Sequence, residues 1–481
     1  MTEDRRSPRL NFEMALVVLL ILILAWAPFP YGSNRPWAQS VLALLVGALS
    51  MLWVGAAVAG GARVTSLTRK LVWPAACFSV ALGWALIQAL NLSFVDHLFG
   101  GTTAFSSLAH PVWSMASQAL AGSGASFISV DPARTITAIL RSAVGIAAFV
   151  VAFELGRNAS HARILLRAAV AIGCFYAALG FAELFLGLDA HSWLMADLKP
   201  TDVRLSGPFI NPNHFATFVG LATLCSLGIL LETLRRMVVW DRGRRILART
   251  FLQALSGNAI WLAAVLLLFS TVLLTQSRGG IAAFLVGVVV LVVGLVTHKN
   301  APPSRGALRS MLPIALVFIL GIAAWIGAGP ILERAQRQGV EDESRAALNL
   351  STLKAIGSAP LLGNGFGAFE RYYPLYADGS VVGDVDQAHN DYLETLADLG
   401  LPAGLAFLAA PMIMAFFCAR GSMTRNRDRL FPAVGAAAAA LVGTHAVVDF
   451  SLQIPAVAVL FTTLLGLGVS QAWSTRSNDG T

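Results

Sequence analysis

Charged residues are scarce in this chain. Asp, Glu, Lys and Arg make up only 12% of its 481 residues, against roughly 25% in an average soluble domain. Hydrophobic residues make up 56%, and the mean hydropathy is +0.70. This composition excludes an ordinary soluble globular protein and indicates repeated membrane crossings.

Cysteine is also scarce. The four cysteines, Cys77, Cys174, Cys225 and Cys418, all fall in or at the ends of apolar segments. A disulfide framework is therefore not expected. The sequence shows neither an internal repeat nor a low-complexity tract, so we expect residues 1–481 to form a single membrane domain.

Apolar segments of the length needed to cross a bilayer occur about twelve times. They are continuous rather than alternating in polarity, which favours helices over the strands of a β-barrel. The predicted fold class is an all-α, polytopic membrane bundle of about twelve transmembrane helices. The segments lie near residues 12–30, 38–59, 71–91, 134–155, 164–187, 214–234, 258–276, 280–297, 311–329, 392–417, 431–449 and 455–473.

The net charge is +8, and the basic residues are distributed as a membrane topology would require. Arginine and lysine cluster before the first span and in alternate loops, which places all the clusters on one side, as the positive-inside rule requires. Both termini are then predicted to be cytoplasmic, and residues 92–133, 188–213 and 330–391 to form outer, periplasmic loops. We expect two or three short helices in the last of these loops. Because the basic clusters are explained by the membrane topology, the positive charge gives no indication of nucleic-acid binding. The clusters are Arg5, Arg6 and Arg9; Arg63, Arg69 and Lys70; Arg157 and Arg163; Arg235, Arg236, Arg242, Arg244, Arg245 and Arg249; and Arg420, Arg425, Arg427 and Arg429.

The first candidate constellation is the stretch from Arg204 to His214, with sequence RLSGPFINPNH. Its turn-forming residues lead into an apolar helix, for which Asn213 is the predicted N-cap. A helix N-terminus favours an anion, and an arginine offers a planar fork that matches phosphate oxygens. Arg204, Asn211 and Asn213 are therefore candidate binding residues. The alternative is a solvated arginine beside an ordinary turn.

The second constellation is the tight hairpin Ser277-Arg278-Gly279-Gly280 between two very apolar segments. An arginine this close to the membrane either extends toward the lipid headgroups or finds a partner. The paired glycines favour a functional site, because they allow a neighbouring chain or a ligand to approach the backbone closely.

The third constellation begins with His389 and Asn390, at the point where the longest outer loop meets the next span. Histidine can act as a general base near neutral pH. The alternative is a histidine that only packs or caps at a helix start. Farther along, His445 and Asp449 are four residues apart on one helix face, either as a functional pair or as a structural one.

Taken together and in this order, these motifs resemble the O-antigen ligase and polymerase superfamily of membrane glycosyltransferases. The resemblance covers roughly residues 200–470. It also includes a Pro-x-x-Gly-x-Gly element at Pro360–Gly365, a Leu-Gly-x-x-Gly turn at Leu399–Gly404 and a stretch from His445 to Pro455.

The resemblance implies transfer of a glycan from undecaprenyl diphosphate, without a metal ion or other cofactor, at the periplasmic face of a bacterial inner membrane. The acceptor would be the lipid A core, a second lipid-linked glycan or a protein. By motif, Arg204 and Arg278 would bind the donor diphosphate, with Asn211, Asn213, Ser277 and Asn390 as further substrate-binding residues. His389 would be the base or would orient the attacking hydroxyl.

Two other functional classes remain as alternatives. A lipid-linked glycan flippase or another secondary transporter would also have about twelve spans, although such proteins favour paired repeats and broken helices at the midplane. A structural scaffold would leave the outer arginines and His389 unexplained. Among enzymes, the sequence does not separate a ligase from a polymerase.

Overall fold

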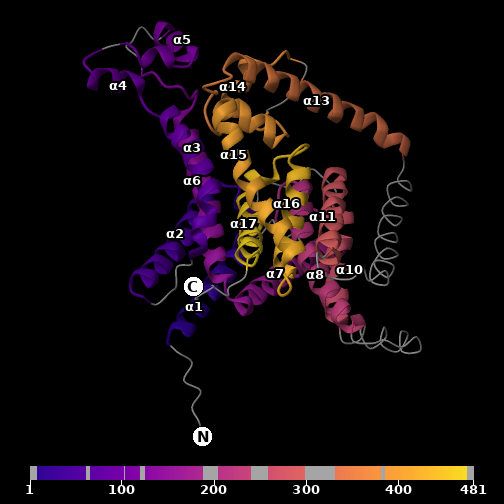
Figure 1. Cartoon of the computed structure of the whole chain (residues 1–481). Helices are drawn as coiled ribbons and strands as arrows, with labels where there is room; N and C mark the ends of the chain where they lie inside the picture. Colours follow the sequence, from indigo (N-terminus) through magenta and orange to yellow (C-terminus); the bar gives the residue numbers. More distant parts are fainter. Residues whose placement is uncertain are drawn as a thin grey trace.

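The structure is a computed structural model of the whole chain. It describes residues 8–60, 66–101, 103–119, 125–187, 204–239, 258–297, 331–379, 381 and 385–473. Within these ranges all the regular secondary structure is helical, and the long helices form one bundle (Figure 1). The predicted all-α fold class is therefore confirmed.

Seven helices in the described ranges are long and apolar enough to cross a membrane. Four shorter apolar helices coincide with four more of the predicted segments. The segment predicted near residues 311–329 lies outside the described residues. The long helices are α2 (Pro36–Val58), α3 (Val72–Gln88, extended to Arg69 by the preceding turn), α6 (Pro132–Leu155), α7 (Ala159–Leu186), α8 (Pro212–Val239), α11 (Arg278–Val296) and α15 (Asp391–Thr424). The shorter ones are α1 (Pro8–Trp26, of which Phe12–Trp26 is the apolar part), α10 (Ala259–Leu274), α16 (Leu430–His445) and α17 (Pro455–Ser470).

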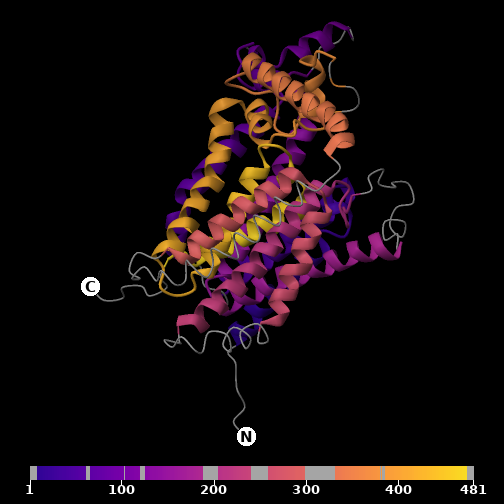
Figure 2. The same cartoon turned by 90° about the vertical axis from the view of Figure 1, so that its right-hand side faces the viewer.

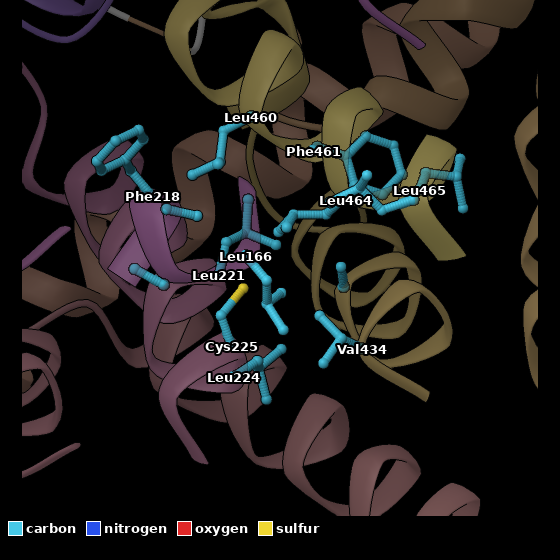
Figure 3. Packing of buried hydrophobic residues seen from close by; sticks show 14 of the residues in the cluster. Leu166, Phe218, Leu221, Leu224, Cys225, Val434, Leu460, Phe461, Leu464 and Leu465 are labelled. Carbon is cyan, nitrogen blue, oxygen red and sulfur yellow. The ribbon is translucent and has the colours of Figure 1, made fainter. Parts of the chain in front are cut away.

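Helix α8 lies at the centre of the bundle. The most apolar part of this helix is wholly buried, because α7, α10, α11, α16 and α17 all pack against it. Figure 3 shows Leu221 and Cys225 of α8 in one buried cluster with Leu166 of α7 and Leu464 of α17. The first residues of α8, which belong to the first candidate constellation, are therefore held by a rigid core.

Short helices and one long helix gather at one end of the bundle (Figures 1 and 2). They are η1 (Tyr31–Ser33), α4 (Leu92–Leu98), η3 (Ser106–Leu108), α5 (Pro111–Ala119), α13 (Ile331–Ser358), α14 (Phe369–Tyr372), η4 (Tyr373–Leu375) and η5 (Ser451–Gln453). Two of the short helices expected in residues 330–391 are present as α14 and η4, but α13, with 28 residues, is a long helix that was not expected there. Its apolar residues pack on α14 and on the start of α15 in a cluster that includes Leu348, Phe369 and Ala397.

The two glycine-containing elements of the resemblance, Pro360–Gly365 and Leu399–Gly404, pack against each other. Gly400 has a φ of 73° and interrupts α15, and a Cβ at this position would lie only 2.5 Å from the carbonyl oxygen of Leu361. The side-chain nitrogen of Asn364 donates a hydrogen bond of 2.9 Å to the carbonyl oxygen of Ala397. The element Pro360–Gly365 therefore serves to pack the outer helices onto the kink of α15.

Basic residues gather at the opposite end of the bundle. Nη2 of Arg163 lies 2.6 Å from Oδ1 of Asp428, and Nη1 of Arg157 donates a 2.6 Å hydrogen bond to the carbonyl oxygen of Ser470. The short helix η2 (Ser66–Leu71) also lies at this end, where Lys70 stacks over Trp473 at 4.7 Å. Among the described residues, the basic clusters around Lys70, around Arg157 and Arg163, and in the loop of Asp428 thus lie at the same end.

Candidate active site

The three predicted constellations and the stretch from His445 to Ser451 meet at one place. The backbone N–H of Asp391 donates a 2.9 Å hydrogen bond to the carbonyl oxygen of Ala446. A Cβ on Gly279 would lie 2.8 Å from Val448 and 3.3 Å from His445. The backbone of Leu205 bonds to Leu274 at 3.4 Å, so the loop of Arg204 lies beside the hairpin of Arg278.

Asp449 is the centre of this arrangement. Its carboxylate is buried and faces three imidazole rings. Oδ1 lies 3.3 Å from Nδ1 of His389 and 3.8 Å from Nε2 of His214, and Oδ2 lies 3.9 Å from Nε2 of His445. Phe450 packs edge-on against the rings of His214 and His389, with centroids 4.7 and 4.9 Å apart. The carboxylate is therefore fixed among groups that can each carry a proton.

The charge of Asp449 is stabilised by its neighbours. Burial by itself disfavours the charged form, but the facing imidazoles of His214 and His389 and the charge of His445 outweigh it and hold the pKa of Asp449 well below its usual range. The backbone N–H of Phe450 adds a hydrogen bond of 2.8 Å to Oδ1. Asp449 thus supplies a permanent negative charge beneath His389.

Of the two alternatives for His445, a functional or a structural pair with Asp449, the contacts of its ring favour the structural one. Its Nδ1 is 2.6 Å from Oγ1 of Thr217 and 3.2 Å from Oγ of Ser451. The ring is only 1% exposed, and Gly279 packs against it. These contacts tie together α8, α11, α16 and η5, so His445 is held inside the protein, whereas His389 is 31% exposed.

Two turns at the site have unusual backbone conformations. His389 has a φ of 51°, and Gln276, directly before Ser277, has a φ of 52°. Non-glycine residues rarely adopt this left-handed conformation, and such strain is concentrated at functional sites. Both turns present a proposed catalytic residue, His389 in one and Arg278 in the other.

Helix starts position most of the predicted substrate-binding residues. The Ser277 hydroxyl accepts a 3.1 Å hydrogen bond from Gly280, and Asn390 accepts one of 3.1 Å from Leu393. The expected N-cap at Asn213 is wrong. Pro212 occupies the first position of α8, and the Asn211 side chain accepts a 2.8 Å bond from the backbone of Asn213. Proline suits this position because its missing N–H would have no helical partner.

The two arginines stand at the outer edge of the site. Arg278 is exposed at the first position of α11, and Arg204 is half-buried just before the turn that leads into α8. Their constellations are adjacent, as the Leu205 and Gly279 contacts show. The structure thus brings together the segments of all the predicted site residues.

Sequence reasoning missed two members of the site. His214 has no spacing motif with Asp449, yet it faces that carboxylate. The positive charge of Arg345 in α13 also acts on His445. The only sequence feature that pointed to Arg345 was its position in the longest polar loop.

One family model matches part of the amino-acid sequence. Residues 263–408 match the model described as O-Antigen ligase. This part of the chain is therefore similar to the O-antigen ligase family. The matched residues include the Ser277 hairpin and His389, while Arg204 and Asp449 lie outside them. A search among curated proteins finds no match.

Proposed function

We propose that this protein is an O-antigen ligase/polymerase-type enzyme, which transfers a glycan from undecaprenyl diphosphate to an acceptor hydroxyl at the periplasmic face of a bacterial inner membrane. The observation that carries the proposal is the contact between His389 and the buried carboxylate of Asp449, next to the loops of two arginines. A base oriented by a carboxylate and fixed cations nearby are the two elements that this reaction needs.

In the proposed reaction, the acceptor oxygen attacks the anomeric carbon of the donor glycan and forms the new glycosidic bond. The bond from that carbon to the diphosphate oxygen breaks, and its electron pair leaves with undecaprenyl diphosphate. Arg204 and Arg278 stabilise the negative charge that develops on this leaving group. The residues of the chain supply this stabilisation without a metal ion or cofactor.

His389 receives the proton of the acceptor hydroxyl. Its Nδ1 faces Asp449 at 3.3 Å, so that an Nδ1–H tautomer leaves the lone pair on Nε2 for the hydroxyl. The charge on Asp449 then stabilises the imidazolium that forms. Asp449 acts through His389 and is a positioning residue.

The proposed orientation rests on the separation of the two ends of the bundle. The candidate site lies at one end, and the basic residues Arg157, Arg163 and Lys70 at the other. With the basic end in the cytoplasm, both termini are cytoplasmic and the site is periplasmic. Alkaline phosphatase and green fluorescent protein fusions in the predicted loops test this orientation, and fluorescent fusions at residues 92–133 would contradict it.

An assay with purified protein in nanodiscs tests the reaction itself. The protein is incubated with an undecaprenyl diphosphate-linked oligosaccharide, with and without a lipid A core acceptor. A ladder without added core identifies a polymerase, and one shifted band that requires the core identifies a ligase. His389→Ala and Arg204→Ala are expected to lose product. The absence of product with wild-type protein, together with movement of labelled lipid across proteoliposomes, would establish the flippase alternative instead.

A further inference from the structure

A long cavity lies on the flank of the bundle opposite the loops that contain Arg204 and Arg278, called the arginine loops below. Its volume is about 320 Å³, and its walls come from α2, α3, α6, α15 and α17. It follows α17 from Pro455 to Leu465, which is about 15 Å at the helical rise. Helices α2 and α3 are the least buried of the seven candidate spans, at 17% and 22%, so this flank faces the lipid.

The cavity has an apolar body and one polar end. Phe78, Phe149, Phe407 and Met414 line the body, and Arg141, Asp391, Glu394, Asp398 and Gln453 lie at the polar end. The shape and the polarity match a lipid whose hydrocarbon chain runs along the helices and whose head reaches the end next to the candidate site.

Two of the carboxylates at the polar end are already engaged by the protein. Glu394 accepts hydrogen bonds from the backbone of Ala388 at 2.8 Å and from Gln453 at 2.8 Å. Asp398 accepts them from Tyr372 at 2.7 Å and from the backbone of Gly367 at 2.6 Å. These two acids fix the outer half of α15 and leave no oxygen without a partner.

Two other groups at the polar end keep unused hydrogen-bonding capacity. Nε of Arg141 and Oδ2 of Asp391 are both buried, and neither has a hydrogen-bond partner among the described residues. Oδ1 of Asp391 is bonded to Gln453 at 3.0 Å. An arginine at membrane depth is costly unless it serves a function, and buried polar atoms without a hydrogen-bond partner require an explanation. A phosphate oxygen would satisfy Arg141, and a hydroxyl would satisfy Asp391.

The cavity and the arginine loops reach the candidate site from different sides. Asp391 and Gln453 line the cavity, and Asp391 is bonded to Ala446, in the turn that leads to Asp449. Neither Arg204 nor Arg278 lines the cavity. His389, directly before Asn390 and Asp391, thus stands between the two sides.

We infer that this cavity holds the single prenyl chain and phosphate of the acceptor, a second lipid-linked glycan. The inference rests on the proposed function, in which the donor diphosphate binds at Arg204 and Arg278. The cavity has one apolar body and one polar end, which matches a lipid with one hydrocarbon chain and one head group. The acceptor hydroxyl then approaches His389 from the α15 side, and the reaction is a polymerisation in which that hydroxyl forms the new glycosidic bond and loses its proton to His389.

Filling the cavity tests the inference. Gly145 lines it, and a Cβ at this position would meet only Thr462, at the ordinary distance of 3.6 Å. Gly145→Phe therefore projects a ring into the cavity. Gly83→Phe is the matched control, because Gly83 of α3 does not line the cavity and a Cβ there would meet no atom within 4 Å.

The first measurement counts lipids bound to the purified protein by native mass spectrometry, with undecaprenyl phosphate as the probe. We expect two bound lipids for wild type and Gly83→Phe, and one for Gly145→Phe. Arg204→Ala combined with Arg278→Ala should also retain one, on the cavity side. Two bound lipids in folded Gly145→Phe would overturn the inference.

The second measurement does not depend on a substitution. Wild-type protein is irradiated with a diazirine-bearing undecaprenyl phosphate, and the labelled peptides are identified. Labels on residues 141–150 of α6 and 455–465 of α17 support the inference, and labels confined to the neighbourhood of Arg204 and Arg278 overturn it. This measurement shows whether the cavity binds the lipid even if Gly145→Phe does not fold.

A third measurement separates this inference from the proposed function. We expect Gly145→Phe and Arg141→Gln to raise the KM for a lipid-linked acceptor at least tenfold, with the donor KM unchanged. If both variants elongate the glycan like wild type, the cavity does not hold the acceptor although the proposed transfer stands. If wild type forms no product, the transfer itself is wrong, while lipid counting and labelling still report on the cavity.

Discussion

Nδ1 of His389 lies 3.3 Å from Oδ1 of Asp449, and the ring of Phe450 packs against the imidazole of His389. The two residues come from different connections, one before α15 and the other after α16. The bond between Asp391 and Ala446 holds those connections together. The geometry of the proposed base thus depends on how α15 and α16 meet.

We predict that Asp449→Asn lowers kcat about a hundredfold, the lower end of the effect of a positioned base. The amide keeps the shape and can still accept the bond from Phe450, but it no longer stabilises a charged His389. Transfer by purified protein measures the change. Asp428→Asn, whose carboxylate pairs with Arg163 at the opposite end, should retain wild-type kcat. Equal rates for Asp449→Asn and wild type would remove Asp449 from the mechanism.

The lowered pKa of Asp449 predicts a pH dependence of stability. Burial opposes its charge, but His214 and His389 favour it and hold the folded-state pKa well below the ordinary value. A depressed carboxylate contributes its full stabilisation above its unfolded pKa, about 3.9, and this contribution is lost as the pH falls through the folded value. The difference in Tm between wild type and Asp449→Asn should therefore shrink as the pH falls below about 4. A difference that grows in acid would contradict the assignment of charge.

The proposed roles of the arginines predict that their loss is more harmful than loss of the base. We expect Arg204→Ala and Arg278→Ala to lose about 10³-fold in turnover, and His389→Ala about 10²-fold. Arg278→Lys should recover part of the rate, because it keeps the charge but loses the planar fork. Exposed Arg427 provides the control, since Arg427→Ala should be unaffected. Turnover of Arg278→Ala equal to wild type would exclude Arg278.

The transmembrane helices were predictable because each is a long apolar run, a signal that lies entirely within the local sequence. Helix α8 was predicted near residues 214–234 and spans Pro212–Val239. The length of α13 was not predictable in the same way, because its charged sequence has no continuous apolar face. Its packing on Phe369 and Ala397 is a tertiary contact that local pattern does not reveal.

The sequence predicted the separate segments of the candidate site but not how they are arranged in space. Arg278 and His389 stood out because polar residues beside apolar spans are costly. The approach of His214 to Asp449 depends on the packing of α8 against α16, and no sequence spacing encodes it. Asn213 was mistaken for the cap because Asn211 and Asn213 both suit that position, and only the helical conformation of Pro212 decides between them.

The close approach of Gly279 to His445 predicts that even a methyl group disturbs the site. In Gly279→Ala the new Cβ would lie 2.8 Å from the Val448 side chain and 3.3 Å from the His445 ring, so one or both of these side chains, or the start of α11, must move. We expect a loss of about 1–3 kcal/mol in stability, the usual cost of overpacking, and at least a tenfold loss of kcat. Gly55→Ala in α2, where no atom lies within 4 Å of the new Cβ, is the control. An active Gly279→Ala protein would show that the hairpin tolerates displacement.

The kink at Gly400 gives a prediction about folding of the outer layer. Gly400 has φ 73° and ψ 166°, a conformation that L residues avoid at a cost of about 1–3 kcal/mol. A Cβ there would also collide with the carbonyl oxygen of Leu361 at 2.5 Å. We expect Gly400→Ala to lower the Tm and to expose residues 359–367 to proteolysis. Gly357→Ala in α13 has open space around it and should be neutral or slightly stabilising, because alanine favours a helix more than glycine does. If Gly400→Ala keeps the protection and Tm of wild type, the kink does not hold the outer layer on α15.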